Sequence, residues 1–253
     1  MRQEFEHYRS RVLPIIQQNS ASSRSNNTIY VPIVVHIIHY GESPVSGANL
    51  STAQIQAQID VLNEDFSATN ESYNTTPDRW KSVIGNPNIQ FCLANIAPNG
   101  NPSNGIPRNN ITVTGTDSDD TNIESEIKPA IAWDPNKYYN IYVLGIPGTT
   151  AGGGVTGYAY LPYAGSIGNR SIDGSVVDYR WFGGPGCSQA GFKTLTHETG
   201  HYLGLFHTFN GRSCGDDDGI TDTPNIGDAT SASGWFGCNS GFPAGPESCG
   251  NEH

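Results

Sequence analysis

The sequence predicts an α/β (α+β) fold in which helices cover a β-sheet. Residues 29–39 (IYVPIVVHIIH) are β-branched and too apolar for a strand with one face in water, so they predict a buried strand. Residues 51–66 have the pattern of an amphipathic helix, and residues 188–204 have a helical pattern that ends at Gly204. A buried strand together with two helices that can cover it favours this fold class.

The helix at 51–66 carries a start signal as well as an apolar face. Ser51 is a good N-cap, and Gln54 stands three residues later, as in a capping box. Ile55, Ile59 and Leu62 follow at i, i+4 and i+7, so one side of the helix is expected to pack on the sheet. Further strands are expected at residues 88–95, 111–114 and 138–144, an exposed strand at 157–161 after a Gly-rich passage, and a brief apolar element at 175–179.

Composition and charge narrow the class of protein. The chain has 253 residues and a formal net charge of −11, from 13 basic and 24 acidic residues, so nucleic acid and anionic membranes are poor partners. No apolar run approaches the roughly 18 residues that a membrane span needs. The acidic, polar composition favours a secreted protein. Residues 1–27 are polar and are expected to be a leader or pro-segment remnant. They lack the continuous apolar stretch of a signal peptide, so either an export signal has been removed, which we favour, or the protein is not exported by that route.

The chain has five cysteines: Cys92, Cys187, Cys214, Cys238 and Cys249. The last three lie in a Gly/Asp/Ser/Pro-rich tail, where a small loop-rich subdomain would need disulfides. An odd count leaves one thiol without an intrachain partner. Zinc ligation by the three clustered cysteines is the alternative, although the chain has no C-x-x-C pair.

The most informative segment is residues 197–207, HETGHYLGLFH. His197 and His201 are four apart, so on a helix they lie on one face and can meet at a single Zn²⁺. Glu198 points about 100° away, which directs it to a zinc-bound water instead of the metal. A carboxylate there can take the proton of the attacking water and later pass it to the leaving amine.

Gly204 and His207 extend the pattern. A third ligand at His207 requires the chain to turn after the helix, and glycine tolerates the positive φ of such a turn. Three protein ligands plus water make a catalytic zinc site. An HExxH segment alone also occurs by chance or on a solvated helix face, but the additional glycine and histidine form the extended metzincin signature.

HETGHYLGLFHTF resembles the active-site segment of the pappalysin family of metzincins. The resemblance extends over residues about 28 to about 225, through VPIVVHIIHY, LSTAQIQAQIDVLNEDFSATN, IQFCLA, YYNIYVLGI, GYAYLP and DGSVVDYRWFG in the family's order. It implies zinc ligation by His197, His201 and His207, with Glu198 as general base and acid. It also implies a twisted mixed sheet, a backing helix and a zinc-binding helix in an upper subdomain at 28–204, followed by an irregular, incomplete lower subdomain at 205–253.

In this family an edge strand above the zinc receives the substrate as an added antiparallel strand. The resemblance places that role on Gly157, Tyr158, Ala159 and Tyr160, acting through their backbone. An ordinary Gly-rich sheet edge is the alternative. Peptides or proteins are then the expected partners, and the oligomeric state stays open.

The acidic segment 216–224 (DDDGITDTP) follows the third histidine. Similar family members hold structural calcium in this region, and carboxylate oxygens suit Ca²⁺, with Asp218 and Asp222 as the expected ligands. The spacing does not fit an EF-hand loop, and a solvated acidic loop is the alternative.

One feature departs from the family pattern. Metzincins carry a methionine turn after the third histidine, whereas the single methionine here is Met1. The expectation is therefore a chain truncated before that turn. The expected function is that of a secreted zinc endopeptidase. The alternatives are a zinc-binding fragment of weak or no activity that only binds peptides, and a structural or adhesion module that holds no zinc.

Overall fold

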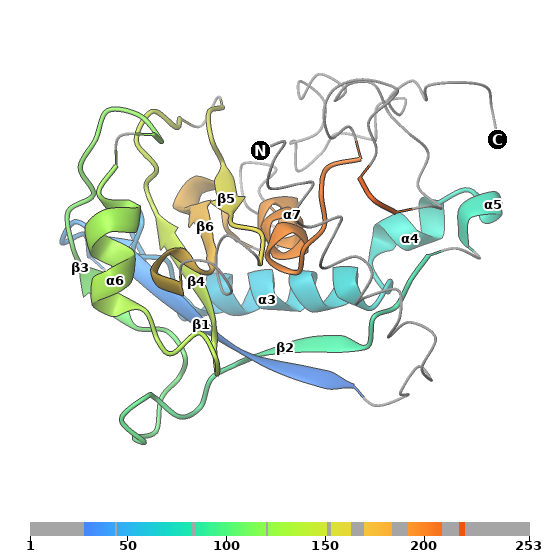
Figure 1. Ribbon diagram of the computed structural model, residues 1–253, viewed down its shortest axis with the longest axis horizontal. Helices are drawn as coiled ribbons and strands as arrows, with labels where there is room; N and C mark the ends of the chain where they lie inside the picture. Colours follow the sequence, from blue (N-terminus) through green and yellow to red (C-terminus); the bar gives the residue numbers. More distant parts are fainter. Residues whose placement is uncertain are drawn as a thin grey trace. The chain divides into compact units, whose positions relative to one another are not determined.

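The computed structural model describes residues 28–43, 45–81, 84–119, 121–150, 153–162, 170–183, 192–208 and 218–220 (Figure 1). The chain forms two compact units, one of residues 28–204 with 236–240, the other of residues 1–27, 205–235 and 241–253. All described helices and strands belong to the first unit. Residues 1–27, Asp222, four of the five cysteines and residues 188–191 of the expected second helix lie outside the described residues.

The centre of the first unit is a mixed sheet, as the family resemblance implies. Its strands follow the order β2-β1-β4-β6-β5, and β3 also pairs with β1. All neighbouring strands are parallel except β5, which runs antiparallel to β6. Because β5 is last in the order, it forms an edge of the described sheet. The strands are β1 (Ile29–His39), β2 (Ile89–Leu93), β3 (Arg108–Asn110), β4 (Tyr139–Leu144), β5 (Gly157–Ala159) and β6 (Ser175–Asp178).

The strand expected at residues 29–39 is β1, and its centre is buried on both faces. Ile33, Val35 and Ile37 join a first core cluster, which includes side chains of the two long helices. Ile38 belongs to a second core cluster on the opposite face. Two covered faces explain why the strand is apolar throughout instead of alternating.

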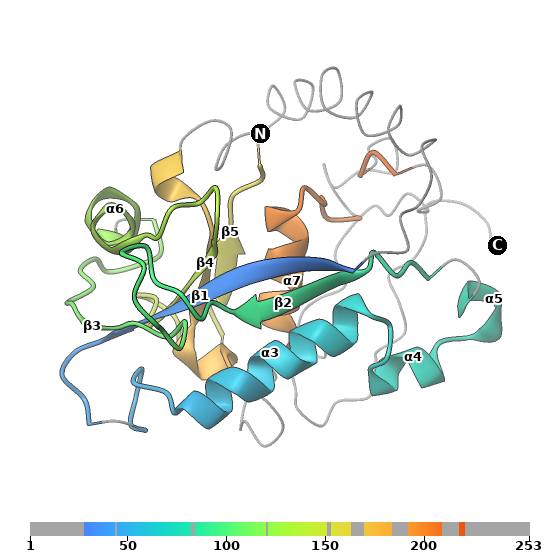
Figure 2. The same cartoon turned by 90° about the horizontal axis from the view of Figure 1, so that it is seen from below.

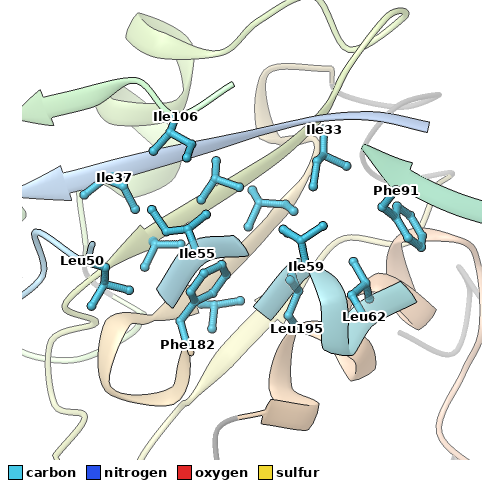
Figure 3. Close-up of a cluster of buried hydrophobic side chains, with 14 of the residues drawn as sticks. Ile33, Ile37, Leu50, Ile55, Ile59, Leu62, Phe91, Ile106, Phe182 and Leu195 are labelled. Carbon is cyan, nitrogen blue, oxygen red and sulfur yellow. The ribbon is translucent and has the colours of Figure 1, made fainter. Parts of the chain in front are cut away.

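The long helix α3 (Thr52–Phe66) covers the first face with the cap that the sequence predicts. The Ser51 hydroxyl accepts from the Gln54 amide at 3.1 Å, and the Gln54 side chain accepts from the Ser51 amide at 3.1 Å. Ile55, Ile59 and Leu62 are buried in the first core cluster (Figure 3). Figure 2 shows α3 running alongside β2, with which it makes contact.

The second face is covered by two short elements that the sequence pattern did not indicate. A π-helix, η1 (Ile123–Ile127), continues directly into α6 (Lys128–Ile131). Ile123 and Ile127 are buried against Tyr142 and Val176 of the sheet. Elements of five and four residues are too short for apolar periodicity to reveal them. The other short helices are α4 (Glu71–Thr75), α5 (Asp78–Lys81) and the 3₁₀ turns Arg170–Ile172 and Tyr179–Trp181.

The prediction of a strand at residues 111–114 is wrong. The strand in this region is β3, three residues earlier, and it pairs with Ile37–His39 of β1. The Ile111 amide donates to the His39 carbonyl at 3.1 Å, and no strand continues beyond it. The alternation of Ile111 and Val113 reflects packing against the second core cluster and not strand pairing.

The other boundaries differ by a few residues. The exposed strand expected at 157–161 ends at Ala159, and the apolar element at 175–179 is β6, which gives way to a 3₁₀ turn at Tyr179. The helix expected at residues 188–204 corresponds to α7 (Phe192–Tyr202) in the described part of the chain. No helix among the described residues is long and apolar enough to cross a membrane.

Replacing the N-cap of α3 tests the capping box. Ser51→Ala removes the acceptor for the Gln54 amide, so the free energy of unfolding should fall by about 1 kcal/mol in urea denaturation. The neighbouring Thr52 is exposed, and Thr52→Ala is the matched control, expected within about 0.5 kcal/mol of wild type. Equal stability of the two variants would show that the cap contributes nothing measurable.

Candidate metal centre

The sheet side of α7 is fixed by hydrogen bonds to buried strand residues. The Tyr139 hydroxyl lies 3.0 Å from the Thr199 hydroxyl and 2.6 Å from the Ser175 hydroxyl. The ring of Tyr202 stacks on Tyr139 with 3.9 Å between centroids. The Ser175 hydroxyl also approaches the Glu198 carbonyl at 3.4 Å. Residues of two strands, β4 and β6, therefore fix the position of α7 on the sheet and its rotation about its own axis.

A second set of contacts holds the first half of α7 on α3. Asp65, near the end of α3, accepts a hydrogen bond from the Thr196 hydroxyl at 2.6 Å and forms an ion pair with Lys193. The Asn70 side chain donates to the same carboxylate at 2.6 Å. The Asp65 side chain is 5% exposed, so these bonds are screened from water and hold the two helices together.

The two helical histidines converge as their spacing predicts. The Nε2 atoms of His197 and His201 lie 3.1 Å apart, with the rings nearly perpendicular at 88°. Two nitrogens bound to one tetrahedral Zn²⁺ at about 2.0–2.1 Å would lie roughly 3.3–3.4 Å apart. The imidazole pair therefore needs only a small adjustment to share one ion.

His207 joins the pair because the chain turns after the helix. Gly204 has a φ of 101°, and its amide donates to the His201 carbonyl at 2.9 Å, which closes the last turn. A side chain would be strained at this φ, so the glycine is required by the turn. One ligand atom from each of His197, His201 and His207 lies within 4.8 Å of the others. His197 is exposed, which leaves the group of three accessible to solvent.

Glu198 occupies the interior side of the same helix. Its residue is 5% exposed, and this burial raises the pKa of the carboxyl to about 8. Burial disfavours the charged form, whereas a cation nearby would favour it. Without a cation the buried carboxyl is therefore held protonated near neutral pH, whereas an ion held by the histidines would favour the carboxylate, the form that can accept a proton from water.

The edge strand β5 passes close to the side chains of Thr194 and Glu198 on α7. A Cβ placed on Gly157 would meet the Thr194 Cγ2 at 2.8 Å, the Val176 carbonyl at 2.9 Å and the Glu198 Cγ at 3.1 Å. Only a residue without a side chain allows the strand this close to α7. Tyr158 and Ala159 complete the strand, and Tyr160 follows it, all half-buried.

The three imidazoles fit a zinc ion in number, chemistry and spacing. Neutral histidine nitrogens are ordinary zinc ligands, and three of them leave a coordination position for water or substrate. Without a metal ion, the 3.1 Å distance between the two Nε2 atoms corresponds to a single hydrogen bond between the two imidazole rings. The metal ligands and the role of Glu198 remain predictions that this geometry supports.

Comparison with known proteins indicates a metallopeptidase. A sequence model of the peptidase family described as pregnancy-associated plasma protein-A, the pappalysins, matches residues 121–243. Mature mirolysin of Tannerella forsythia, solved with a cleaved peptide, is 34% identical over 81% of this chain and 75% of its own, with a TM-score of 0.68. The chain belongs to the pappalysin family of metallopeptidases.

Other relatives agree with this membership. A promirolysin mutant from the same organism is 32% identical over 90% of this chain and 73% of its own, with a TM-score of 0.71. An extracellular metalloprotease of Pyricularia oryzae is 28% identical over 92% of this chain and 67% of the relative. One of Colletotrichum graminicola is 29% identical over 94% of this chain and 73% of the relative.

The calcium site expected in this pappalysin is described only in part. Asp218 is buried, and its Oδ1 accepts a hydrogen bond from the Ile220 amide at 3.0 Å. Asp222, the other expected ligand, lies outside the described residues. Calcium binding therefore stays a prediction. The same holds for disulfides, since Cys92, the one described cysteine, is a free and exposed thiol.

Sequence reasoning missed the residues that hold the site in place. Tyr139, Ser175 and Asp65 contact α7 from three different elements, and no local pattern marks them. Gly157 was predicted as part of the edge strand, but its close approach to Glu198 was not. A glycine that begins a strand is a known sign of close backbone approach, and this was the available signal.

Alanine at position 157 tests the contact between β5 and α7. Gly157→Ala should lower the free energy of unfolding by about 1–3 kcal/mol, because the new methyl group overlaps its neighbours. The rate of peptide hydrolysis should fall as well, because Glu198 is among those neighbours. Chemical denaturation and an activity assay measure the two effects.

Gly85→Ala is the matched control, because a Cβ at Gly85 meets nothing within 4 Å. It should change stability by no more than about 0.5 kcal/mol and leave activity intact. A Gly157→Ala protein that matches this control would contradict the described packing.

Proposed function

We propose that this pappalysin is a zinc-dependent endopeptidase that cleaves internal bonds of protein substrates outside the cell. The observation that carries the proposal is the meeting of His197, His201 and His207 within 4.8 Å, beside the buried Glu198. The named relatives support it, since several are extracellular metalloproteases and one was solved with a cleaved peptide.

The three histidines would hold the zinc ion through their ring nitrogens. The bound ion supplies a Lewis acid for the scissile carbonyl and lowers the pKa of a water molecule. Glu198 acts as general base, accepting a proton from the attacking water, and then as general acid, donating it to the leaving amine. Its burial holds the side chain in place and excludes competing water.

The backbone of β5 would bind the substrate. Among the described strands, β5 pairs with β6 alone, so its other edge offers backbone donors and acceptors to an extended peptide. Gly157, Tyr158, Ala159 and Tyr160 are the residues proposed for this role. Gly157 would place the bound peptide beside Glu198, because a Cβ at position 157 would lie only 3.1 Å from the Glu198 Cγ.

The alternative of a zinc-binding fragment that only binds peptides is not favoured. The relatives of this chain are proteases by name, and Glu198 is present and buried beside the proposed metal ligands, where a general base is needed. No observation favours a structural or adhesion module.

Removing the general base is the direct test of function. Glu198→Gln keeps the shape of the side chain but removes the base, so kcat should fall by roughly 10²–10⁴-fold on a denatured protein substrate. Glu64→Gln, an exposed position on α3, is the matched control and should retain wild-type activity. A zinc chelator should abolish wild-type cleavage. Full activity of Glu198→Gln would overturn the assignment.

Metal content tests the ligands separately. Wild type and Glu198→Gln should each bind one zinc ion, measured by elemental analysis and competition with a chelating dye. His207→Ala should weaken zinc affinity by more than roughly 100-fold, because loss of a ligand costs more than loss of a supporting group. Unchanged affinity in His207→Ala would show that this histidine is not a ligand.

A further inference from the structure

A buried lysine lies beneath the edge strand, on the face of the sheet opposite to α7. Lys128 is fully buried. Its ammonium pairs with the Glu124 carboxylate at 2.8 Å and donates to the Ile172 carbonyl at 3.0 Å. A buried charge is costly unless it is paired and hydrogen-bonded. Burial lowers the pKa of Lys128, whereas the neighbouring Glu124 carboxylate raises it. The charged form of Lys128 is therefore stabilised by Glu124.

Three tyrosine rings surround this ammonium. Lys128 Nζ lies 5.3 Å from the ring centroid of Tyr142, 5.4 Å from that of Tyr158 and 5.2 Å from that of Tyr160. These distances are within the range of cation–π attraction. Tyr142 belongs to β4, whereas Tyr158 belongs to β5 and Tyr160 directly follows that strand. Two of the three rings thus tie the edge strand to one charge.

A hydrogen bond completes the connection. The Tyr158 hydroxyl donates to the Glu124 carboxylate at 2.8 Å. Burial raises the pKa of this hydroxyl, so it stays protonated and remains a donor. A bond from a hydroxyl to a carboxylate in a partly buried site is among the stronger kinds in proteins.

The strand is therefore held from both faces by consecutive residues. Gly157 contacts Thr194 and Glu198 of α7, and Tyr158 contacts the Lys128–Glu124 pair on the other side. Successive residues of a strand point to opposite faces, so these two supports act on the same short segment. β5 has only three residues and one bonded neighbour among the described strands, so sheet pairing alone holds it weakly.

We propose that the buried Lys128–Glu124 pair, acting through Tyr158, holds the edge strand β5 in the position in which it receives the substrate. This inference rests on the proposed role of β5 in substrate binding. Lys128 and Glu124 touch no reacting atom, so they are positioning residues and not catalytic ones. A role in stability alone would leave the KM of the folded enzyme unchanged.

Removing the Tyr158 hydroxyl tests the proposal with the least disturbance. Tyr158→Phe keeps the ring over Lys128 and loses only the bond to Glu124. KM for a peptide substrate should rise roughly three- to tenfold, in line with the net loss of one typical hydrogen bond. The kcat should change less than twofold, since uniform binding affects KM alone.

Tyr142→Phe is the matched control. Tyr142 presents its ring to the same ammonium, but its buried hydroxyl has no hydrogen-bond partner among the described residues. Its KM and kcat should equal those of wild type. Lys128→Met, which keeps an unbranched chain of similar length, should raise KM at least as much as Tyr158→Phe in protein shown to be folded.

Hydrogen exchange of the amides at 157–160 provides a readout that does not need activity. These amides should exchange faster in Tyr158→Phe than in wild type and Tyr142→Phe. If the wild-type protein cleaves nothing, the proposed function fails, and faster exchange in Tyr158→Phe alone still supports the positioning role. Unchanged KM and unchanged exchange in Tyr158→Phe would overturn the inference.

Discussion

The buried side of α7 carries polar residues, and the hydrogen bonds that two of them make with the sheet help to hold the two helical histidines in place. Thr194, Glu198 and Thr199 are 3%, 5% and 0% exposed. Tyr139 bonds the Thr199 hydroxyl, Ser175 approaches the Glu198 backbone carbonyl, and Leu195 belongs to the first core cluster. Burying a polar group costs free energy unless it is paired, so the bond between Thr199 and Tyr139 favours the helix rotation that keeps it.

That rotation has consequences on both sides of the helix. It turns His197 and His201 toward solvent, where they can meet an ion, and turns Glu198 inward beside Gly157 of β5. The opposite face of β5 is held by Tyr158 on the Lys128–Glu124 pair. A chain of contacts thus runs from a buried ion pair through the edge strand to the proposed general base. Rigid support of this kind is what a metal site needs to keep its geometry.

Sequence patterns were informative where a local rule applies. The capping box of α3, the continuous apolar run of β1 and the spacing of His197, His201, Gly204 and His207 each follow from such a rule, and the structure has the corresponding helix, strand and turn. The patterns were uninformative where long-range packing decides. The strand Arg108–Asn110 is polar and exists because it pairs with β1, while the apolar residues after it pack without pairing. Lys128 would be expected on the surface, and its burial among three rings, on which the proposed positioning role rests, follows from long-range packing.

A crystal structure of the zinc-loaded chain, with anomalous diffraction recorded at the zinc absorption edge, tests the central claim most directly. The account predicts one strong anomalous peak bound by the ring nitrogens of His197, His201 and His207, each at about 2.0–2.1 Å. Glu198 should lie beside the ion without ligating it. A peak held by fewer than three of these histidines, or by other residues, would contradict the account.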